Sequence, residues 1–81
     1  MIIDDIKRIV SLHLGIRDIE NNDRFMEDLN AESLDVMNII ASVEEKFNLV
    51  ILESEIPELQ TPSALATLVE NRMNGQNKHN I

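Results

Sequence analysis

The stretch FMEDLNAESLDVMNIIASVEEKF, residues 25–47, decides the fold of this chain because it joins an irregular segment to a strongly periodic one. Over Ser33–Phe47 the apolar residues recur at steps of three and four, which is typical of an amphipathic helix. Their arc is wider than sealing a core requires, so part of this helix is expected to face a ligand or a partner. Ahead of it, Phe25, Met26 and Leu29 follow no regular period, and as bulky apolar groups they are expected to return to the core.

Before this stretch, the sequence predicts a first helix over Ile2–Leu14 and then a long loop. Asp4 and Asp5 suit the positive end of a helix dipole, and Gly15 can adopt the left-handed conformation that ends a helix. Residues 16–23 mix isolated apolar side chains with Asp and Asn, whose short side chains satisfy the backbone of turns. The apolar face of the helix is formed by Ile2, Ile3, Ile6, Ile9, Val10 and Leu14.

Beyond the periodic stretch, residues 48–52 form an apolar run that is interpreted as a buried loop, since a lone strand would have nothing to pair with. A short helical turn is expected over residues 53–59, where Pro57 limits or distorts it. Thr61 and Pro62 are typical of a helix start, a cap followed by proline at the first helical position. The sequence therefore predicts one more helix from this point.

The chain is expected to form one small all-α domain. Its 81 residues, of which 43% are hydrophobic, are enough for a single compact core and too few for a second. The last helix is expected to end near Met73, and the polar residues 74–81 cannot repay the entropy of ordering. We therefore predict a bundle of three main helices plus one short helix over residues 1–73, followed by a disordered polar tail.

The composition limits the classes of partner. Fifteen acidic residues against seven basic ones give a formal charge of −8, which repels nucleic-acid phosphates and anionic membrane surfaces and attracts basic protein faces. The chain has no cysteine, no apolar run of the roughly 20 residues that cross a bilayer, and an acidic start where a signal peptide would be basic. A soluble cytoplasmic monomer is expected, without nucleic acid or membrane insertion. Acidic residues such as Asp18, Glu20 and Asp23 match no calcium loop, so no metal site is predicted.

Ser33 stands where the loop meets the central helix, and two interpretations of it are open. A serine at a helix start is most often an N-cap, which hydrogen-bonds a backbone N–H of the first turn. Alternatively, its hydroxyl is exposed for covalent modification, because the free N–H groups of the first turn favour an attached phosphate. Catalysis by Ser33 is not expected, since nothing in the sequence places His13 or His79 beside it as a base. His13 is instead expected to pack partly buried beside the apolar face of the first helix.

The motif around this serine resembles the acyl carrier protein family. In that family an aromatic residue, an acidic pair and leucine precede a short loop and the sequence Asp-Ser-Leu-Asp, whose serine receives 4′-phosphopantetheine. The corresponding runs here are Phe25-Met26-Glu27-Asp28-Leu29 and Glu32-Ser33-Leu34-Asp35. The resemblance is nearly full-length, because it extends to Leu14-Gly15-Ile16, Asn21-Asn22, Glu44-Glu45 and the closing helix.

The resemblance implies a carrier that is not an enzyme, folded as a small acyl-carrier-like bundle. Ser33 would hold 4′-phosphopantetheine derived from coenzyme A, a flexible arm whose terminal thiol carries growing acyl chains as thioesters. The chain would shuttle them between the enzymes of fatty-acid synthesis. Its partners would be a phosphopantetheinyl transferase, also called a holo-acyl-carrier synthase, and acyl-processing enzymes with basic docking patches.

The resemblance also implies roles for residues near the serine and in the core. Acidic residues would steer basic partners and apolar ones would contact them between the charges, although Met37 could equally be plain core packing. The partner-recognition residues would be Glu32, Leu34, Asp35, Met37, Ala41, Glu44 and Glu45. The residues that are first of all core, and that in the family also part to admit an acyl chain, are Phe25, Leu29, Ile39, Ile40, Val43, Ile51, Leu59 and Leu65.

The chain departs from the family pattern at several positions. Glu32 replaces the usual aspartate, and Ile51-Leu52 replaces isoleucine-proline. Asn38 and Lys46 stand where acidic residues are common, which reduces the negative field on the helix. Three alternatives to fatty-acid synthesis are open: a carrier for a specialised polyketide, lipid A or aminoacyl pathway, a helical interaction module that is never modified, and a small hydrolase that uses Ser33. The last lacks a recognisable base and oxyanion site.

Overall fold

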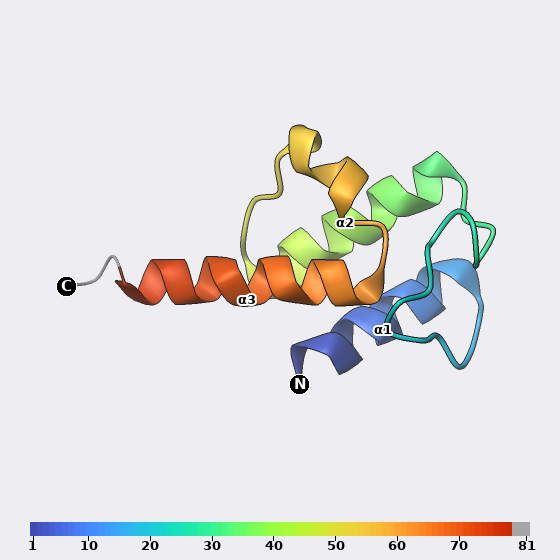
Figure 1. Cartoon of the computed structure of the whole chain (residues 1–81), viewed down its shortest axis with the longest axis horizontal. Coiled ribbons are helices and arrows are strands. Elements are labelled where there is room, and N and C mark those ends of the chain that lie inside the picture. The colour runs from blue at the N-terminus through green and yellow to red at the C-terminus, as the bar shows by residue number, and fades with distance from the viewer. Residues whose placement is uncertain (79–81) are drawn as a thin grey trace.

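The computed structural model describes the backbone of residues 1–78 and the side chains of residues 1–75. In chain order its elements are α1 (Ile2–Leu14), α2 (Ser33–Phe47), the 3₁₀ helix η1 (Glu53–Glu58) and α3 (Pro62–Lys78), and these residues contain no strand (Figure 1). Because α1 packs against both α2 and α3, it is the central helix of the bundle. The predicted all-α bundle of three main helices and one short helix is confirmed.

Local sequence signals set both ends of α1, whose bounds agree with the prediction. Asp4 and Asp5 lie in its first turn, where they complement the helix dipole. Gly15 ends the helix in the left-handed conformation, at φ 66°, and its N–H donates to the Ser11 carbonyl at 2.8 Å. On the inner face, Ile6 is fully buried, so the apolar face predicted from the sequence does meet the core.

The long loop between α1 and α2 is joined to the start of α3 by backbone hydrogen bonds. The N–H of Phe25 donates to the Gln60 carbonyl at 2.9 Å, and the N–H of Ser63 donates to the Asn21 carbonyl at 2.9 Å. The Phe25 side chain is fully buried. The prediction that Met26 also returns to the core is wrong, because this side chain is 47% exposed. This part of the loop is a succession of turns, in which adjacent side chains point in different directions.

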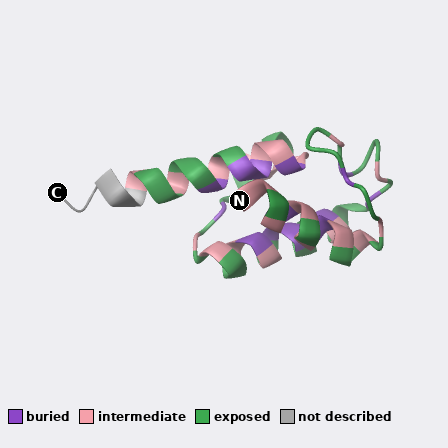
Figure 2. Cartoon of the chain, turned by 90° about the horizontal axis from the view of Figure 1, so that it is seen from below, coloured by how far each residue is buried: buried purple, intermediate pink, exposed green. Residues whose placement is uncertain are grey.

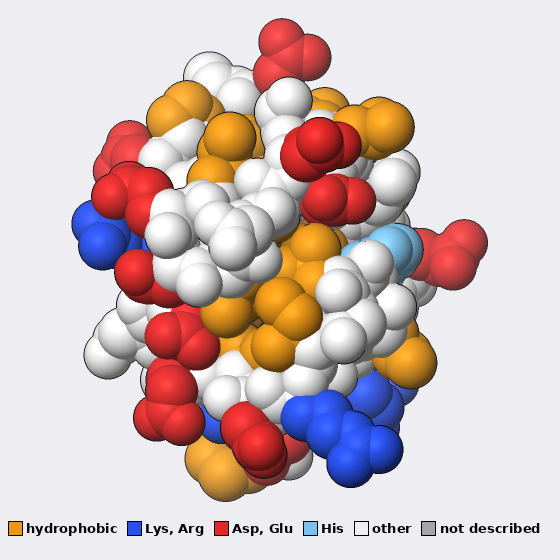
Figure 3. Space-filling model, turned by 90° about the vertical axis from the view of Figure 1, so that its right-hand side faces the viewer, with side chains coloured by type: hydrophobic (Ala, Val, Ile, Leu, Met, Phe, Trp, Pro, Cys, Tyr) orange, Lys and Arg blue, Asp and Glu red, His pale blue; other side chains and the backbone are white. Residues whose placement is uncertain are grey.

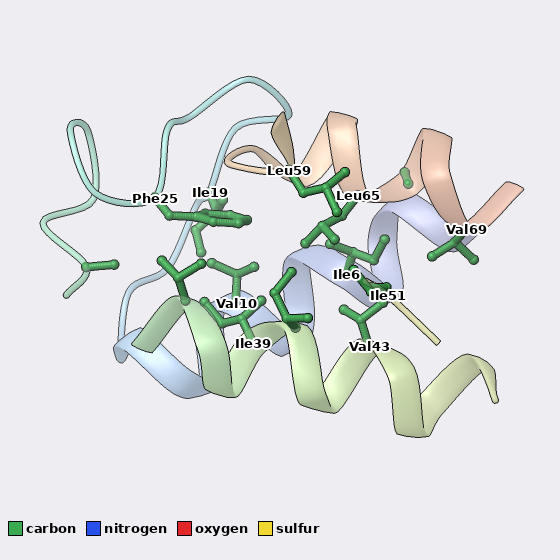
Figure 4. Close-up of a cluster of buried hydrophobic side chains, with 14 residues drawn as sticks. Ile6, Val10, Ile19, Phe25, Ile39, Val43, Ile51, Leu59, Leu65 and Val69 are labelled. Carbon is green, nitrogen blue, oxygen red and sulfur yellow. The ribbon is translucent and has the colours of Figure 1, made fainter. Parts of the chain in front are cut away.

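The core lies between the three α-helices, and Phe25 is the one aromatic residue among its buried, described members. This ring enters from the long loop, Ile51 from the segment after α2, and Leu59 from the segment after η1 (Figure 4). Among the residues expected in the core, those that are buried are Phe25, Ile39, Ile40, Val43, Ile51, Leu59 and Leu65, and Leu29 is half-buried against them. Both long connections are therefore held to the helices by apolar side chains of their own.

The segment between α2 and η1 is only partly buried, which corrects the sequence interpretation. Ile51 is buried, but Val50 and Leu52 on either side of it are 68% and 58% exposed. Leu52 has an extended backbone, and in extended chain successive side chains point to opposite sides, so Val50 and Leu52 point away from the core when Ile51 points into it. η1 then ends at Glu58, one residue earlier than predicted, with Pro57 inside it.

The start of α3 is capped as the sequence predicts. The Thr61 hydroxyl accepts the N–H of Ala64 at 3.0 Å, and Pro62 is the first helical residue. Leu65 and Val69, one turn apart, are fully buried. The N-terminal half of this helix therefore belongs to the core.

The end of α3 differs from the prediction, because the helix passes Met73 and runs to Lys78. Its C-terminal half projects beyond the other helices (Figure 1), and among the side chains described, residues 62–75, the buried ones lie in the opposite half (Figure 2). A helix that has been nucleated gains one hydrogen bond per added residue, so it can extend without burying a side chain. The predicted polar tail thus does not begin at residue 74, and its last part, residues 79–81, lies outside the described residues.

Candidate functional site

Ser33 is the first residue of α2, and its side chain is exposed. The N-cap of the helix is Glu32, whose backbone is extended at φ −89° and ψ 164°. The interpretation of Ser33 as the N-cap is therefore wrong. Within the described residues its hydroxyl serves no capping bond, which leaves the oxygen free for chemistry.

Local hydrogen bonds fix the backbone on which this serine stands. Asn30 takes the left-handed conformation at φ 58°, which asparagine tolerates better than most residues. The N–H of Ala31 then donates to the Phe25 carbonyl at 2.8 Å. The N–H of Glu32 donates to Asp35 Oδ2 at 2.9 Å, which is one half of a capping box. Because Phe25 is fully buried, the serine is presented at the surface by a loop that is anchored in the core.

The start of α2 suits a group that is attached through a phosphate. The first turn of a helix has N–H groups without intrahelical acceptors and the positive end of the dipole, and both stabilise an anion. The Asp35 carboxylate is turned toward the Glu32 N–H, so it is not committed to the Ser33 hydroxyl. The exposed position of Ser33 also leaves room for a long substituent. The residues present therefore fit a covalently bound phosphodiester.

A serine–histidine pair is formed elsewhere on α2, away from Ser33. His13 is exposed, and its Nε2 lies 2.7 Å from Ser42 Oγ in a hydrogen bond between α1 and α2. The expectation that His13 is partly buried is wrong, because its ring reaches across the polar surface between the two helices. His79 lies outside the described residues. The geometry of the described chain thus gives no support to a hydrolase that uses Ser33.

The face of α2 that points to solvent carries a row of exposed apolar side chains, Leu34, Met37 and Ala41. These follow at helical spacing, and Leu34 is 68% exposed and Met37 45%. The core-packing alternative for Met37 is therefore wrong. Asn38 and Glu45 are exposed on the same face. The apolar arc over Ser33–Phe47 is wide because α2 has two apolar faces, the exposed α2 row and the opposite face that is buried in the core.

The four acidic residues predicted for recognition are in different environments. Glu32 and Glu45 are exposed near the two ends of the exposed α2 row, roughly 20 Å apart along the helix axis at 1.5 Å per residue. Asp35 is half-buried and bonded to the Glu32 N–H. Glu44 is half-buried, and its Oε2 accepts the N–H of Ile51 at 2.8 Å. Glu44 therefore has a structural role that sequence reasoning missed, and no spacing in the sequence signals it.

An ion-pair cluster in the long loop precedes the site. Arg24 Nη1 lies 2.7 Å from Glu27 Oε2, and Arg24 Nε lies 3.2 Å from Asp28 Oδ2. The side-chain hydrogen bond from Arg24 holds the pKa of Asp28 below its ordinary value. This cluster was also missed, although its spacing of three and four residues is a recognisable signal. At this end of the molecule, acidic side chains are spread around an apolar patch (Figure 3).

Two other kinds of site are absent from the described part of the chain. No group of three or more His, Asp or Glu residues there could hold a metal ion. No helix of residues 1–78 is long and apolar enough to cross a membrane.

Comparison with known proteins finds one family and several relatives. The model of the family described as phosphopantetheine attachment site matches residues 4–69. An acyl carrier protein of Chlamydia caviae is 39% identical over 71 residues, which cover 85% of this chain and 92% of the relative. An acyl carrier protein of Chlamydia muridarum is 37% identical over 73 residues, 88% of this chain and 95% of the relative. A third acyl carrier protein, of Wolinella succinogenes, is 35% identical over 71 residues, which cover 85% of this chain and 93% of the relative.

Proposed function

This chain belongs to the acyl carrier protein family, and we propose that Ser33 is the residue that bears its prosthetic arm. The protein carries acyl chains on covalently attached 4′-phosphopantetheine. The observation that most supports Ser33 is its place as the exposed first residue of α2, with a hydroxyl that serves no capping bond. The match to the attachment-site family extends on both sides of it.

In this proposal the residues around Ser33 hold the arm and leave the chemistry to other proteins. When bound, the group supplies a flexible arm whose terminal thiol holds an acyl group as a thioester. The free N–H groups of the first turn stabilise its phosphate, and the bond from Glu32 to Asp35 keeps that turn formed. The buried Phe25 keeps the serine at the surface, within reach of a transferase. We therefore infer that the chain is a carrier and not an enzyme.

Partners are proposed to dock on the solvent face of α2. The exposed α2 row supplies an apolar centre, and Glu32 and Glu45 supply a negative charge near each end of it. Asp35 and Glu44 contribute less, because each is half-buried and bonded to a backbone N–H. The complementary surface has an apolar depression between two basic patches. We expect it on a phosphopantetheinyl transferase and on acyl-processing enzymes.

The acyl chain is proposed to enter the apolar interior of the bundle. The residues expected to part for it are Phe25, Leu29, Ile39, Ile40, Val43, Ile51, Leu59 and Leu65, which are buried or half-buried. The pathway we propose is fatty-acid synthesis, because the relatives bear the plain name acyl carrier protein. A specialised polyketide, lipid A or aminoacyl pathway is the alternative, which Asn38 and Lys46 favour. Assaying which acyl-carrier synthases accept the holo form distinguishes the two.

The attachment site is tested by the intact mass of the protein after incubation with coenzyme A and a phosphopantetheinyl transferase. We expect the wild type to gain one phosphopantetheine and Ser33→Ala to gain none. Ser42→Ala is the matched control, because Ser42 lies on the same helix but is half-buried and bonded to His13; it should still gain the group. No gain by the wild type with an active transferase would favour a helical interaction module that is never modified.

Two further sequence predictions, the cytoplasmic location and the monomeric state, stay predictions. Light scattering of the purified protein tests the second, and a mass above that of one chain would contradict it.

A further inference from the structure

Arg72 of α3 joins two segments that lie far from it in the chain. Its Nη1 donates to the Val50 carbonyl, in the segment between α2 and η1, and its Nη2 donates to the Glu55 carboxylate in η1. The Arg72 side chain is 35% exposed and that of Glu55 27%, so both groups are partly withdrawn from water. A guanidinium can make both bonds at once, because its donors form a rigid fork.

The segment that Arg72 reaches is bound to α2 on its other side. The N–H of Ile51 donates to Glu44 Oε2 at 2.8 Å, so adjacent residues of the segment are held by two different helices. The Ile51 side chain belongs to the same buried cluster as Val43 of α2 and Val69 of α3 (Figure 4). The position of the Ile51 side chain in the core therefore depends on two polar contacts of the backbone, one of Ile51 with Glu44 and one of Val50 with Arg72.

η1 has few attachments of its own to the bundle. None of its six residues, all of them described, is buried. A groove of about 420 Å³ lies between η1 and α3, and its lining includes Glu55, Arg72 and the apolar side chains of Leu59 and Leu68. Arg72 and Glu55 are thus part of the lining of a groove that mixes polar and apolar side chains. Elements with few buried contacts open at a lower free-energy cost than the core helices. Ile56 packs partly buried against the core, and the Arg72 contact adds a polar attachment to this packing.

We propose that Arg72 is a strap that holds residues 50–55 against α3 and sets the cost of opening this end of the core to an acyl chain. The proposal rests on the carrier function proposed above. α1 packs against both α2 and α3. The core therefore opens most readily between α2 and α3, which are joined through residues 50–55. An acyl chain that enters the core only when the core is open is bound in proportion to the population of the open state. Breaking the strap therefore favours sequestration of the chain.

Amide hydrogen exchange on the unmodified protein tests the strap without any cargo. In Arg72→Gln, the exchange of the Ile51 N–H is expected to quicken about two- to tenfold, the factor that corresponds to one intramolecular hydrogen bond. The exchange of Val10 in α1 should stay unchanged. Arg8→Gln is the matched control, since the exposed Arg8 pairs with the half-buried Asp5 on α1 at 3.6 Å, and it should leave the exchange of Ile51 unchanged.

A conservative variant separates the fork of Arg72 from its charge. Arg72→Lys keeps the positive charge but offers a single ammonium, which cannot bond the Val50 carbonyl and the Glu55 carboxylate with the same geometry. Its exchange at Ile51 is expected to lie between those of the wild type and Arg72→Gln. Full rescue by lysine would overturn the proposal that both contacts are needed.

An octanoyl thioester on the pantetheine arm tests the consequence for cargo. We expect hydroxylamine to cleave this thioester more slowly in Arg72→Gln than in the wild type or Arg8→Gln. An octanoyl chain that spends more time in the core draws the thioester toward the protein and shields it from hydroxylamine. The expected factor is again about two to ten, since the same opening equilibrium sets it. Faster exchange at Ile51 with unchanged cleavage would overturn the link to cargo.

Two results of the exchange measurement would overturn the strap itself. One is unchanged exchange at Ile51 in Arg72→Gln. The other is an equal acceleration at Val10, because that reports a loss of stability in the whole fold. If Ser33 accepts no arm, the proposed attachment site has failed, whereas the exchange measurement on the unmodified protein still decides whether Arg72 holds the segment.

Discussion

Replacing Phe25 with alanine tests whether a single ring anchors the loop that presents Ser33. Phe25 heads the large side chains that are fully buried, and it projects from the loop into the cluster of aliphatic residues between the helices (Figure 4). Its backbone bonds to Gln60 and Ala31 remain possible in the variant. The change therefore isolates the contribution of the side chain.

The expected loss is large compared with the stability of the whole domain. Phenylalanine to alanine in a core costs about 3–5 kcal/mol, through lost transfer free energy and the cavity left behind. A chain of 81 residues has a total free energy of unfolding of about 4–12 kcal/mol, at roughly 0.05–0.15 kcal/mol per residue. Since 1 kcal/mol shifts Tm by about 4–8 °C in a domain of this size, the Tm of Phe25→Ala should fall by at least about 12 °C.

Urea denaturation followed by far-UV circular dichroism is the appropriate assay, because the chain has no tryptophan or tyrosine for fluorescence. Met26→Ala is the matched control, since this neighbouring side chain is 47% exposed and its removal should cost less than about 1 kcal/mol. A loss below about 1 kcal/mol for Phe25→Ala would refute the reasoning, given the cost of core cavities. Equal losses for the two variants would refute it as well.

Three further predictions concern docking, a helix end and pH. Leu34→Ala should raise the KM of a phosphopantetheinyl transferase for the apo protein about fivefold, as for a docking contact worth about 1 kcal/mol. Leu12 is an exposed leucine on α1, and Leu12→Ala should leave the KM unchanged. Equal KM values for the two variants would contradict the docking face. Gly15→Ala should cost about 1–2 kcal/mol in urea denaturation. The cost arises from the positive φ alone, since no heavy atom from farther along the chain lies within 4 Å of the added Cβ. A neutral result would count against that account. The hydrogen bond from Arg72 holds the pKa of Glu55 below its ordinary value of 4.5, so its contribution to stability is complete above that value and is lost as the pH falls through the lowered pKa. The wild type should therefore lose more urea resistance between about pH 5 and pH 3 than Glu55→Gln, and parallel losses would show that this pair contributes nothing.

The helices could be predicted from the sequence because their signals are local. The apolar period and Gly15 give the bounds of α1, and Thr61 with Pro62 gives the start of α3. Burial outside the helices could not be predicted in this way. Met26 and Val50 are apolar yet exposed, because the turn or extended backbone that carries them decides their direction and leaves no period in the sequence.

The candidate site, too, could be predicted from the sequence only in part. Ser33 can be singled out from its motif and from its place between a loop and a helix. Side-chain contacts between the elements are different, because they join residues that are far apart in the chain. His13 to Ser42 and Arg72 to Glu55 are examples, and both depend on how the helices pack, which no local pattern specifies.

Fragmentation mass spectrometry of the loaded protein tests the central claim most directly, because it locates the added group. Besides Ser33, the chain has serines at positions 11, 42, 54 and 63 that an intact mass alone does not distinguish. We predict that the fragments containing Ser33, and none that lack it, carry the mass of one phosphopantetheine. A group found on any other residue would contradict the assignment of Ser33 at the start of α2 as the attachment site.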